Sequence, residues 1–206
     1  MKNIKREKQN NINKCHQMMD ISIFSKELLG FWFYLMSDCI IFFTLFSVYL
    51  VLMNNVSRGP SGHNIFQYSL IILETFLLLF SSFTCSLALF SMKNKKKCST
   101  IFWLIFTFCL GISFSILEFF EFYHLIYKGY GPSCSGFLSS FFVLLSTHGL
   151  HVISGLIWII VMIGYIFVFG ITNLIYYRML CLNLFWHFLD IVWVFLFSII
   201  YLFGAI

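Results

Sequence analysis

Ionisable side chains inside long apolar runs are the residues of this chain that could do chemistry. His148 and His151 lie three positions apart in the uncharged stretch GFLSSFFVLLSTHGLHVISGLIWIIVM and therefore share one face of a helix. His187 and Asp190 have the same spacing in a later run, so they are close enough on one face to pair. A polar group in hydrocarbon costs free energy unless a partner satisfies it, so both faces are expected to look into protein.

Helix rise predicts that the ionisable residues of these runs form two layers. At 1.5 Å per residue, Asp38 lies about 12 Å from one end of its run and Asp190 about 15 Å from the same side. Glu118 and Glu121 share a face near the opposite side, with His124 one further i+3 step along. The predicted inner layer comprises Asp38, His148, His151, His187 and Asp190. The predicted outer layer comprises Glu74, Glu118, Glu121 and His124.

Three kinds of chemistry fit these layers. Histidines at one depth could ligate haem, copper or iron, and a line of carboxylates could relay protons. The third interpretation is that the groups hydrogen-bond one another across helices and fix the packing of an apolar bundle. The only histidine pair at i,i+3 has no carboxylate on its own helix, and no motif has metal-ligand spacing. We therefore expect no catalytic residue, no cofactor and no metal ligand in this chain, and an inner layer that forms one interhelical hydrogen-bonded cluster.

The elements that position these residues are predicted transmembrane helices. Hydrophobic residues make up 60% of the chain and charged residues 10%, against roughly a quarter charged in ordinary soluble domains. Five apolar runs are long enough to cross a bilayer as helices. The predicted fold is an all-α integral membrane protein, with spans at about 28–53, 67–92, 99–127, 136–162 and 179–203. A polar segment, 1–27, precedes this five-helix domain of residues 28–206, and we interpret it as a flexible tail.

The distribution of Lys and Arg predicts the orientation of the bundle. The tail, the second loop and the fourth loop hold six, four and one of the thirteen, which makes eleven, whereas the first and third loops hold Arg58 and Lys128. Because cytoplasmic loops carry the excess of basic residues, we expect a cytoplasmic amino terminus and an external carboxyl terminus. The basic clusters are suited to anionic lipid head groups rather than to nucleic acid.

Several segments resemble a known family. SSFFVLLSTHGLHVISGLIW and NLFWHFLDIVWVFLFSIIYL look like the FF…HGLHV…G and WHFxDxVW segments of subunit III of haem–copper respiratory oxidases. GFWFYLMSDCIIFFTLFSVYLVL and ILEFFEFYHLI are similar to corresponding helices of that family. The resemblance covers residues 28–206. Five helices, without the two extra leading ones of the mitochondrial form, are more similar to the quinol-oxidising branch.

The resemblance implies a partner rather than a catalyst. In that family the haems and copper reside in subunit I, and subunit III packs on it in the membrane and keeps the oxidase stable. The complex oxidises ubiquinol, reduces oxygen to water and translocates protons across the bacterial cytoplasmic membrane. The matching positions are not redox ligands in the family: Asp38, Glu118, Glu121, His148, His151, Trp186, His187, Asp190 and Trp193.

Two other functions stay open at this point. A subunit III of a cytochrome-c-oxidising enzyme would have the same fold, because other subunits choose the electron donor. A free-standing transporter or membrane metalloprotein is the second, although the chain has no inverted repeat and no paired broken helices in corresponding halves.

Overall fold

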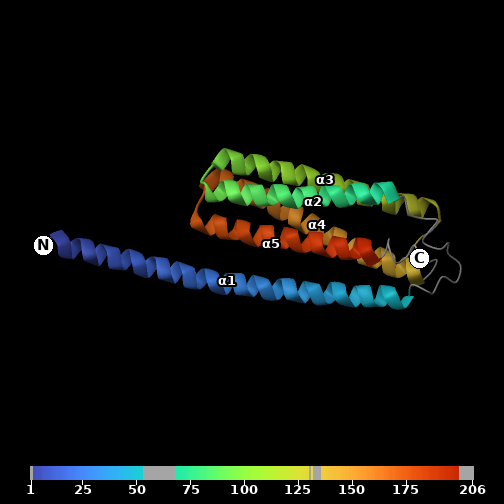
Figure 1. Cartoon of the computed structure of the whole chain (residues 1–206), viewed down its shortest axis with the longest axis horizontal. Helices are drawn as coiled ribbons and strands as arrows, with labels where there is room; N and C mark the ends of the chain where they lie inside the picture. Colours follow the sequence, from blue (N-terminus) through green and yellow to red (C-terminus); the bar gives the residue numbers. More distant parts are fainter. Residues whose placement is uncertain (1, 53–67, 130, 132–135, 200–206) are drawn as a thin grey trace. The chain divides into compact units, whose positions relative to one another are not determined.

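The structure, a computed structural model, describes residues 2–52, 68–129, 131 and 136–199. All regular elements in these ranges are helical (Figure 1). The helices are α1 Lys2–Leu52, α2 Tyr68–Lys93, α3 Lys97–Tyr127, α4 Gly136–Phe169 and α5 Asn173–Leu196. Each contains a segment long and apolar enough to cross a membrane: 26–52, 70–93, 97–127, 136–169 and 173–199. The prediction of a five-span, all-helical protein is therefore confirmed.

The ends of three helices differ from the sequence-based prediction. Helix α4 ends at Phe169, seven residues after the predicted end of the fourth span at 162. The segment expected to be a flexible tail is helical, because α1 begins at Lys2 and continues without a break into the first span. No Gly or Pro occurs before Gly30, and Lys, Glu and Gln are good helix formers, so nothing in this segment stops the helix. The fifth helix begins at Asn173, six residues before the predicted start, because Thr172 caps it by accepting a hydrogen bond from the Ile175 N–H at 3.4 Å. The cytoplasmic placement of the segment 1–27 stays a prediction.

The chain divides into two compact units within α1, between Asp38 and Cys39. The described part of the first unit is the amino-terminal portion of α1. The second unit contains the rest of α1 and the helices α2 to α5. The ring of Phe42 lies 5.2 Å from that of His151, and the ring of Tyr49 lies 5.6 Å from that of Phe137, so the end of α1 packs against α4.

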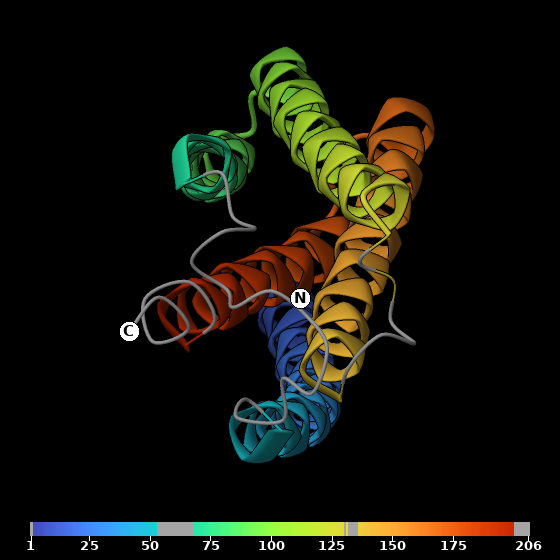
Figure 2. The ribbon, with the colours of Figure 1, turned by 90° about the vertical axis from the view of Figure 1, so that its right-hand side faces the viewer.

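Helices α2 to α5 form a closed ring of neighbours. Contacts join α2 to α3, α3 to α4, α4 to α5, and α5 back to α2 (Figures 1 and 2). Short turns fix two of these pairs. Lys95 has a φ of 56° in the turn between α2 and α3, and Gly170 has a φ of 73° after α4, which is the left-handed conformation that commonly ends a helix. The space enclosed by this ring is where the polar side chains meet.

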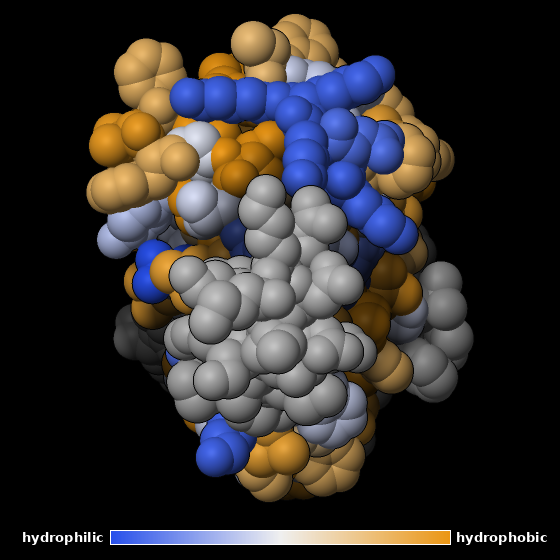
Figure 3. All heavy atoms as spheres, turned by 90° about the vertical axis from the view of Figure 1, so that its left-hand side faces the viewer, coloured by the Kyte–Doolittle hydropathy of each residue, from blue (hydrophilic) through white to orange (hydrophobic). Residues whose placement is uncertain are grey.

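One end of the bundle gathers hydrophilic side chains. Figure 3 views the end where the turns between α2 and α3 and between α4 and α5 lie, and it shows hydrophilic residues around the described part of this face. Lys93, Lys95, Lys96 and Lys97 are exposed there. The Lys97 ammonium donates to the Phe167 carbonyl at 3.0 Å, and the Arg178 guanidinium lies 5.3 Å from the centre of the Tyr165 ring. Cations from α3 and α5 therefore hold the carboxyl-terminal end of α4, where the helix dipole favours positive charge.

A polar seam inside the helix ring

Trp186 of α5 occupies the centre of the four-helix ring. Its side chain is almost completely buried, and its indole N–H donates to Ser81 Oγ of α2 at 2.9 Å. Two glycines make room for the ring. A Cβ added at Gly111 of α3 would lie 3.2 Å from Trp186, and one at Gly155 of α4 would lie 2.9 Å from it. One tryptophan thus contacts the three other helices, because small residues let their backbones approach closely.

Trp193 repeats this arrangement two helical turns later. Its indole N–H donates to Thr75 Oγ1 of α2 at 3.2 Å, and its ring packs edge-on against Phe114 of α3 with centroids 4.8 Å apart. The fully buried His148 of α4 lies against the same indole, 5.1 Å between ring centres, and its Nε2 lies 3.4 Å from the Leu189 carbonyl. The predicted inward orientation of His148 is what the structure shows, and its polar contact is with the α5 backbone.

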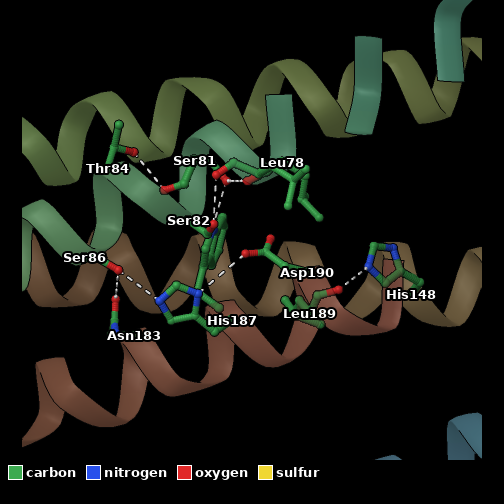
Figure 4. A network of polar contacts seen from close by, with 12 residues as sticks. Leu78, Ser81, Ser82, Thr84, Ser86, His148, Asn183, His187, Leu189 and Asp190 are labelled. Atoms are coloured by element: carbon green, nitrogen blue, oxygen red, sulfur yellow. Dashed lines mark hydrogen bonds and ion pairs between the residues drawn. The ribbon is translucent and has the colours of Figure 1, made fainter. Parts of the chain in front are cut away.

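The predicted stripe on α5 meets α2 along a polar seam (Figure 4). His187 Nε2 lies 2.9 Å from Ser86 Oγ, and this hydroxyl also donates to Asn183 Oδ1 at 3.4 Å. On its other side, His187 Nδ1 lies 3.8 Å from Asp190 Oδ2. The His187 side chain is 43% exposed, whereas that of Asp190 is 8% exposed. The seam therefore has a buried carboxyl and a half-exposed imidazole in the same apolar surface.

The contacts of the seam run from a hydroxyl to an imidazole to a carboxyl, as in a hydrolase triad: Ser86, His187 and Asp190. The arrangement nevertheless lacks two features that such catalysis requires. The imidazole–carboxyl distance of 3.8 Å is beyond hydrogen-bond length. Ser86 lies in the interior of α2, where the backbone N–H groups are already bonded within the helix and offer no oxyanion hole. Helix-to-helix hydrogen bonding is the chemistry that this geometry supports.

The other two residues of the predicted inner layer, His151 and Asp38, are not part of this seam. His151 Nδ1 contacts the Thr147 carbonyl of its own helix at 2.7 Å, and its ring rests on Phe42. Asp38 is the last residue of the first compact unit. The single cluster of all five residues thus stays a prediction, of which the structure brings together His187 and Asp190.

Three predicted outer-layer carboxyls come together. Glu74 of α2 and Glu118 of α3 are buried, and each lies within electrostatic range of the other and of Glu121. His124 is exposed one turn further along α3, in a shallow groove that Glu121 also lines. Within the described ranges, no three His, Cys, Asp or Glu side chains are arranged to hold a metal ion. The expectation that this chain carries no cofactor is not tested by that observation.

Sequence reasoning missed the α2 side of this site. Ser81, Thr75 and Ser86 supply the oxygen atoms that α5 contacts, and Thr84 bonds Thr107 of α3 at 2.9 Å. Single Ser and Thr residues in an apolar run carry little signal, since they usually bond their own helix backbone. The seven-residue spacing of Trp186 and Trp193 was the available clue, because it places both indoles on one face.

Comparison with known proteins identifies the family of this chain. The family model described as cytochrome c oxidase subunit III matches residues 8–205, which is nearly the whole chain. The chain belongs to the cytochrome c oxidase subunit III family. The polar seam and the tryptophan pair are therefore features of a member of this family.

Relatives within the family are subunits of quinol oxidases. The chain is 72% identical over 188 residues to the cytochrome bo(3) ubiquinol oxidase subunit 3 of Buchnera aphidicola subsp. Baizongia pistaciae (strain Bp), covering 91% of this chain and 97% of that protein. It is 50% identical over 179 residues to the protein of the same name from Pseudomonas putida, with 87% and 86% covered. It is 40% identical over 177 residues to the quinol oxidase subunit 3 of Bacillus spizizenii (strain ATCC 23059 / NRRL B-14472 / W23), with 86% and 87% covered.

Proposed function

We propose that this chain is the third, non-redox subunit of a proton-translocating ubiquinol oxidase. The observation that carries the proposal is the 72% identity to a cytochrome bo(3) ubiquinol oxidase subunit 3 over 97% of that relative's length. The complex would oxidise ubiquinol and reduce oxygen to water, with its haems and copper in the catalytic subunit I. This chain would bind subunit I in the bacterial cytoplasmic membrane and stabilise it.

The contacts of the bundle support a packing role. Both central indole N–H groups and the imidazole of His187 contact hydroxyls of α2, and Nε2 of His148 lies against a backbone carbonyl of α5. Side chains that hydrogen-bond across helices fix helix packing, whereas ligands of a redox centre must point at a common metal. The half-exposed His187 is also consistent with a protein partner on this face, because polar groups exposed to hydrocarbon are costly.

Purification of the tagged chain in mild detergent tests the proposal. We expect haem-bearing subunits and ubiquinol oxidase activity to co-purify with the tagged chain. The amounts of haem and of activity per tagged chain should stay constant through further purification. The chain released from its partners should then show no haem absorption and no stoichiometric copper or iron. Stoichiometric metal on the released chain, or co-purification without any haem protein, would refute the proposal.

A cytochrome-c-oxidising complex is the second candidate, and the family description names that enzyme. The names of the relatives described above favour quinol as the donor. The purified complex decides between them: oxidation of ubiquinol without oxidation of reduced cytochrome c supports the first candidate, and the reverse supports the second.

A further inference from the structure

A groove opens on the surface of the bundle between α3 and α4. Its volume is about 270 Å³, close to the lower end of the roughly 300–1,000 Å³ typical of small-molecule sites. The groove is lined by Ser115, Glu118, Phe119, Phe122, Ser146, Gly149, Leu150 and Ile153. Its surface is thus almost entirely apolar, with one ionisable side chain.

That side chain, Glu118, is buried and incompletely satisfied. The residue is 4% exposed, and its Oε1 has no hydrogen-bond partner in the part of the chain that the structure describes. Among the described residues that line the groove, none is a Lys, Arg or His that could act as a counter-charge. A carboxyl without a cation in hydrocarbon is held at least cost in its neutral form, in which it can both donate and accept a hydrogen bond.

Gly149 of α4 brings the wall of the groove against this carboxyl. A Cβ added at Gly149 would lie 2.9 Å from both Glu118 oxygens. Any larger residue at this position would therefore displace the carboxyl or fill the space beside it. Gly164, on the same helix, has no atom within 4 Å of an added Cβ. The approach at Gly149 is thus a local feature of α4, and its neighbour is the Glu118 carboxyl.

Depth restricts which molecule can meet Glu118. The residue lies nine positions before Tyr127, the end of α3, which is about 14 Å along the helix. The 31 residues of α3 measure about 46 Å, which exceeds the hydrocarbon core of about 30 Å by about 16 Å. With the helix centred in the core, about 8 Å projects beyond it on each side. Glu118 then lies about 6 Å inside the hydrocarbon. A phospholipid head group does not reach this level, and its acyl chain has no group that can bond a carboxyl.

We propose that the α3–α4 groove binds the head group of a quinol or quinone, with Glu118 as its hydrogen-bond partner. The inference rests on the proposed function, because a ubiquinol oxidase works in a membrane that carries this molecule. A quinol places hydroxyl groups on a ring that is itself soluble in hydrocarbon, and its isoprenoid tail matches the apolar wall formed by Phe119, Phe122 and Leu150. The groove concentrates the substrate at the surface of the complex.

Photolabelling of the intact complex tests this site. The complex is placed in nanodiscs of phosphatidylethanolamine and phosphatidylglycerol and exposed to a photoreactive azido-ubiquinone, and labelled peptides are mapped by mass spectrometry. We expect label on α3 and α4 beside Glu118, competed by short-chain ubiquinone. Glu118→Leu and Gly149→Ala should each raise the probe concentration needed for half-maximal labelling roughly tenfold, the effect of losing one hydrogen bond.

Two matched variants separate binding from folding. Glu118→Gln keeps a donor and an acceptor of the same shape and should retain labelling, and Gly164→Ala should label as the unmodified complex does. Haem content and ubiquinol turnover report that each variant complex is assembled. Absence of label in an assembled complex overturns the proposal. So do equal competition by oleic acid, label on another subunit in place of α3 and α4, or unchanged labelling of Gly149→Ala. A complex that lacks this chain or does not oxidise ubiquinol would instead refute the proposed function.

Discussion

The hydrogen bond between Trp186 and Ser81 shows how one residue joins the helices of this bundle. The indole N–H of α5 donates a hydrogen bond to the Ser81 hydroxyl of α2 at 2.9 Å. The Ser81 hydroxyl in turn donates a hydrogen bond to the Leu78 carbonyl at 2.7 Å. Each buried polar group of this pair therefore has a partner. In an apolar bundle without a hydrophobic driving force between helices, such bonds and close packing select one arrangement.

A double-mutant cycle measures this bond. Trp186→Phe removes the N–H and Ser81→Ala removes the hydroxyl, and we expect a coupling free energy of about 0.6–1.7 kcal/mol between them. The measurement is the free energy of unfolding in mixed detergent micelles. Ser154→Ala, which removes an exposed hydroxyl bonded only to its own helix, is the matched control and should couple weakly with Trp186→Phe. A coupling no larger than that of the control would show that the indole acts through packing alone.

Asp190 carries the second prediction at this scale. Its carboxyl is buried and lies 3.8 Å from the His187 imidazole, so Asp190→Ala removes this neighbour and leaves a cavity at the seam. We expect the subunit to lose about 1–3 kcal/mol of folding free energy. This loss should be seen as release of the subunit from the complex during purification. Electron transfer in the complexes that keep the subunit should be nearly unchanged. Asp190→Asn preserves the shape and should retain more of the subunit.

Normal assembly of the Asp190→Ala complex together with lost ubiquinol oxidation would contradict this expectation. That outcome would give the chain a direct chemical role. Haem content per tagged subunit measures assembly, and oxygen uptake with ubiquinol measures turnover, so the two effects are separable.

At the scale of the helices, glycines decide where two backbones approach. Gly155 of α4 faces the Trp186 ring, with an added Cβ only 2.9 Å away, whereas Gly164 on the same helix has open space. The indole is packed among three helices and cannot withdraw without moving α5. Overpacking at such a contact typically costs about 1–3 kcal/mol.

Substitution of these two glycines therefore gives opposite results. Gly155→Ala should lower the free energy of unfolding in detergent by about 1–3 kcal/mol. Gly164→Ala should leave it unchanged or raise it by up to about 1 kcal/mol, because Ala has the higher helix propensity. Equal effects of the two substitutions would mean that Trp186 does not pack against α4 as the structure has it.

The five spans could be predicted from the sequence because hydrocarbon thickness sets the length of an apolar helix, and this constraint acts on each segment separately. The polar stripe on α5 followed from helical periodicity for the same reason. The hydrogen-bond partners of that stripe could not be predicted from periodicity, because they depend on which helices become neighbours. Ser81 and Thr75 are ordinary residues until α2 is placed beside α5. The start of α1 at Lys2 was missed because a polar segment without Gly or Pro can be helix or coil, and its composition alone does not decide.

Lys and Arg are unevenly distributed among the segments that precede, join and follow the spans of the whole chain. Of the thirteen, six lie in residues 1–27, four lie where α2 ends and α3 begins, and Arg178 lies near the start of α5, which makes eleven. The other two are Arg58 and Lys128. The turns between α2 and α3 and between α4 and α5 lie at the same end of the helix ring, where the hydrophilic surface gathers (Figure 3). With basic residues retained on the cytoplasmic side, this end is predicted to be cytoplasmic.

Reporter fusions test that orientation across the full chain. A reporter that is active only outside the cytoplasm should be active when fused after Ile206 and silent when fused after Lys97. Activity after Lys97 with silence after Ile206 would reverse the orientation. The lysines are the physical cause, so replacing Lys93, Lys95 and Lys96 by Gln, which leaves the Lys97 contact to α4 intact, should increase the fraction of molecules with reporter activity after Lys97. The amino-terminal segment still holds six basic residues, so this change should be partial rather than complete.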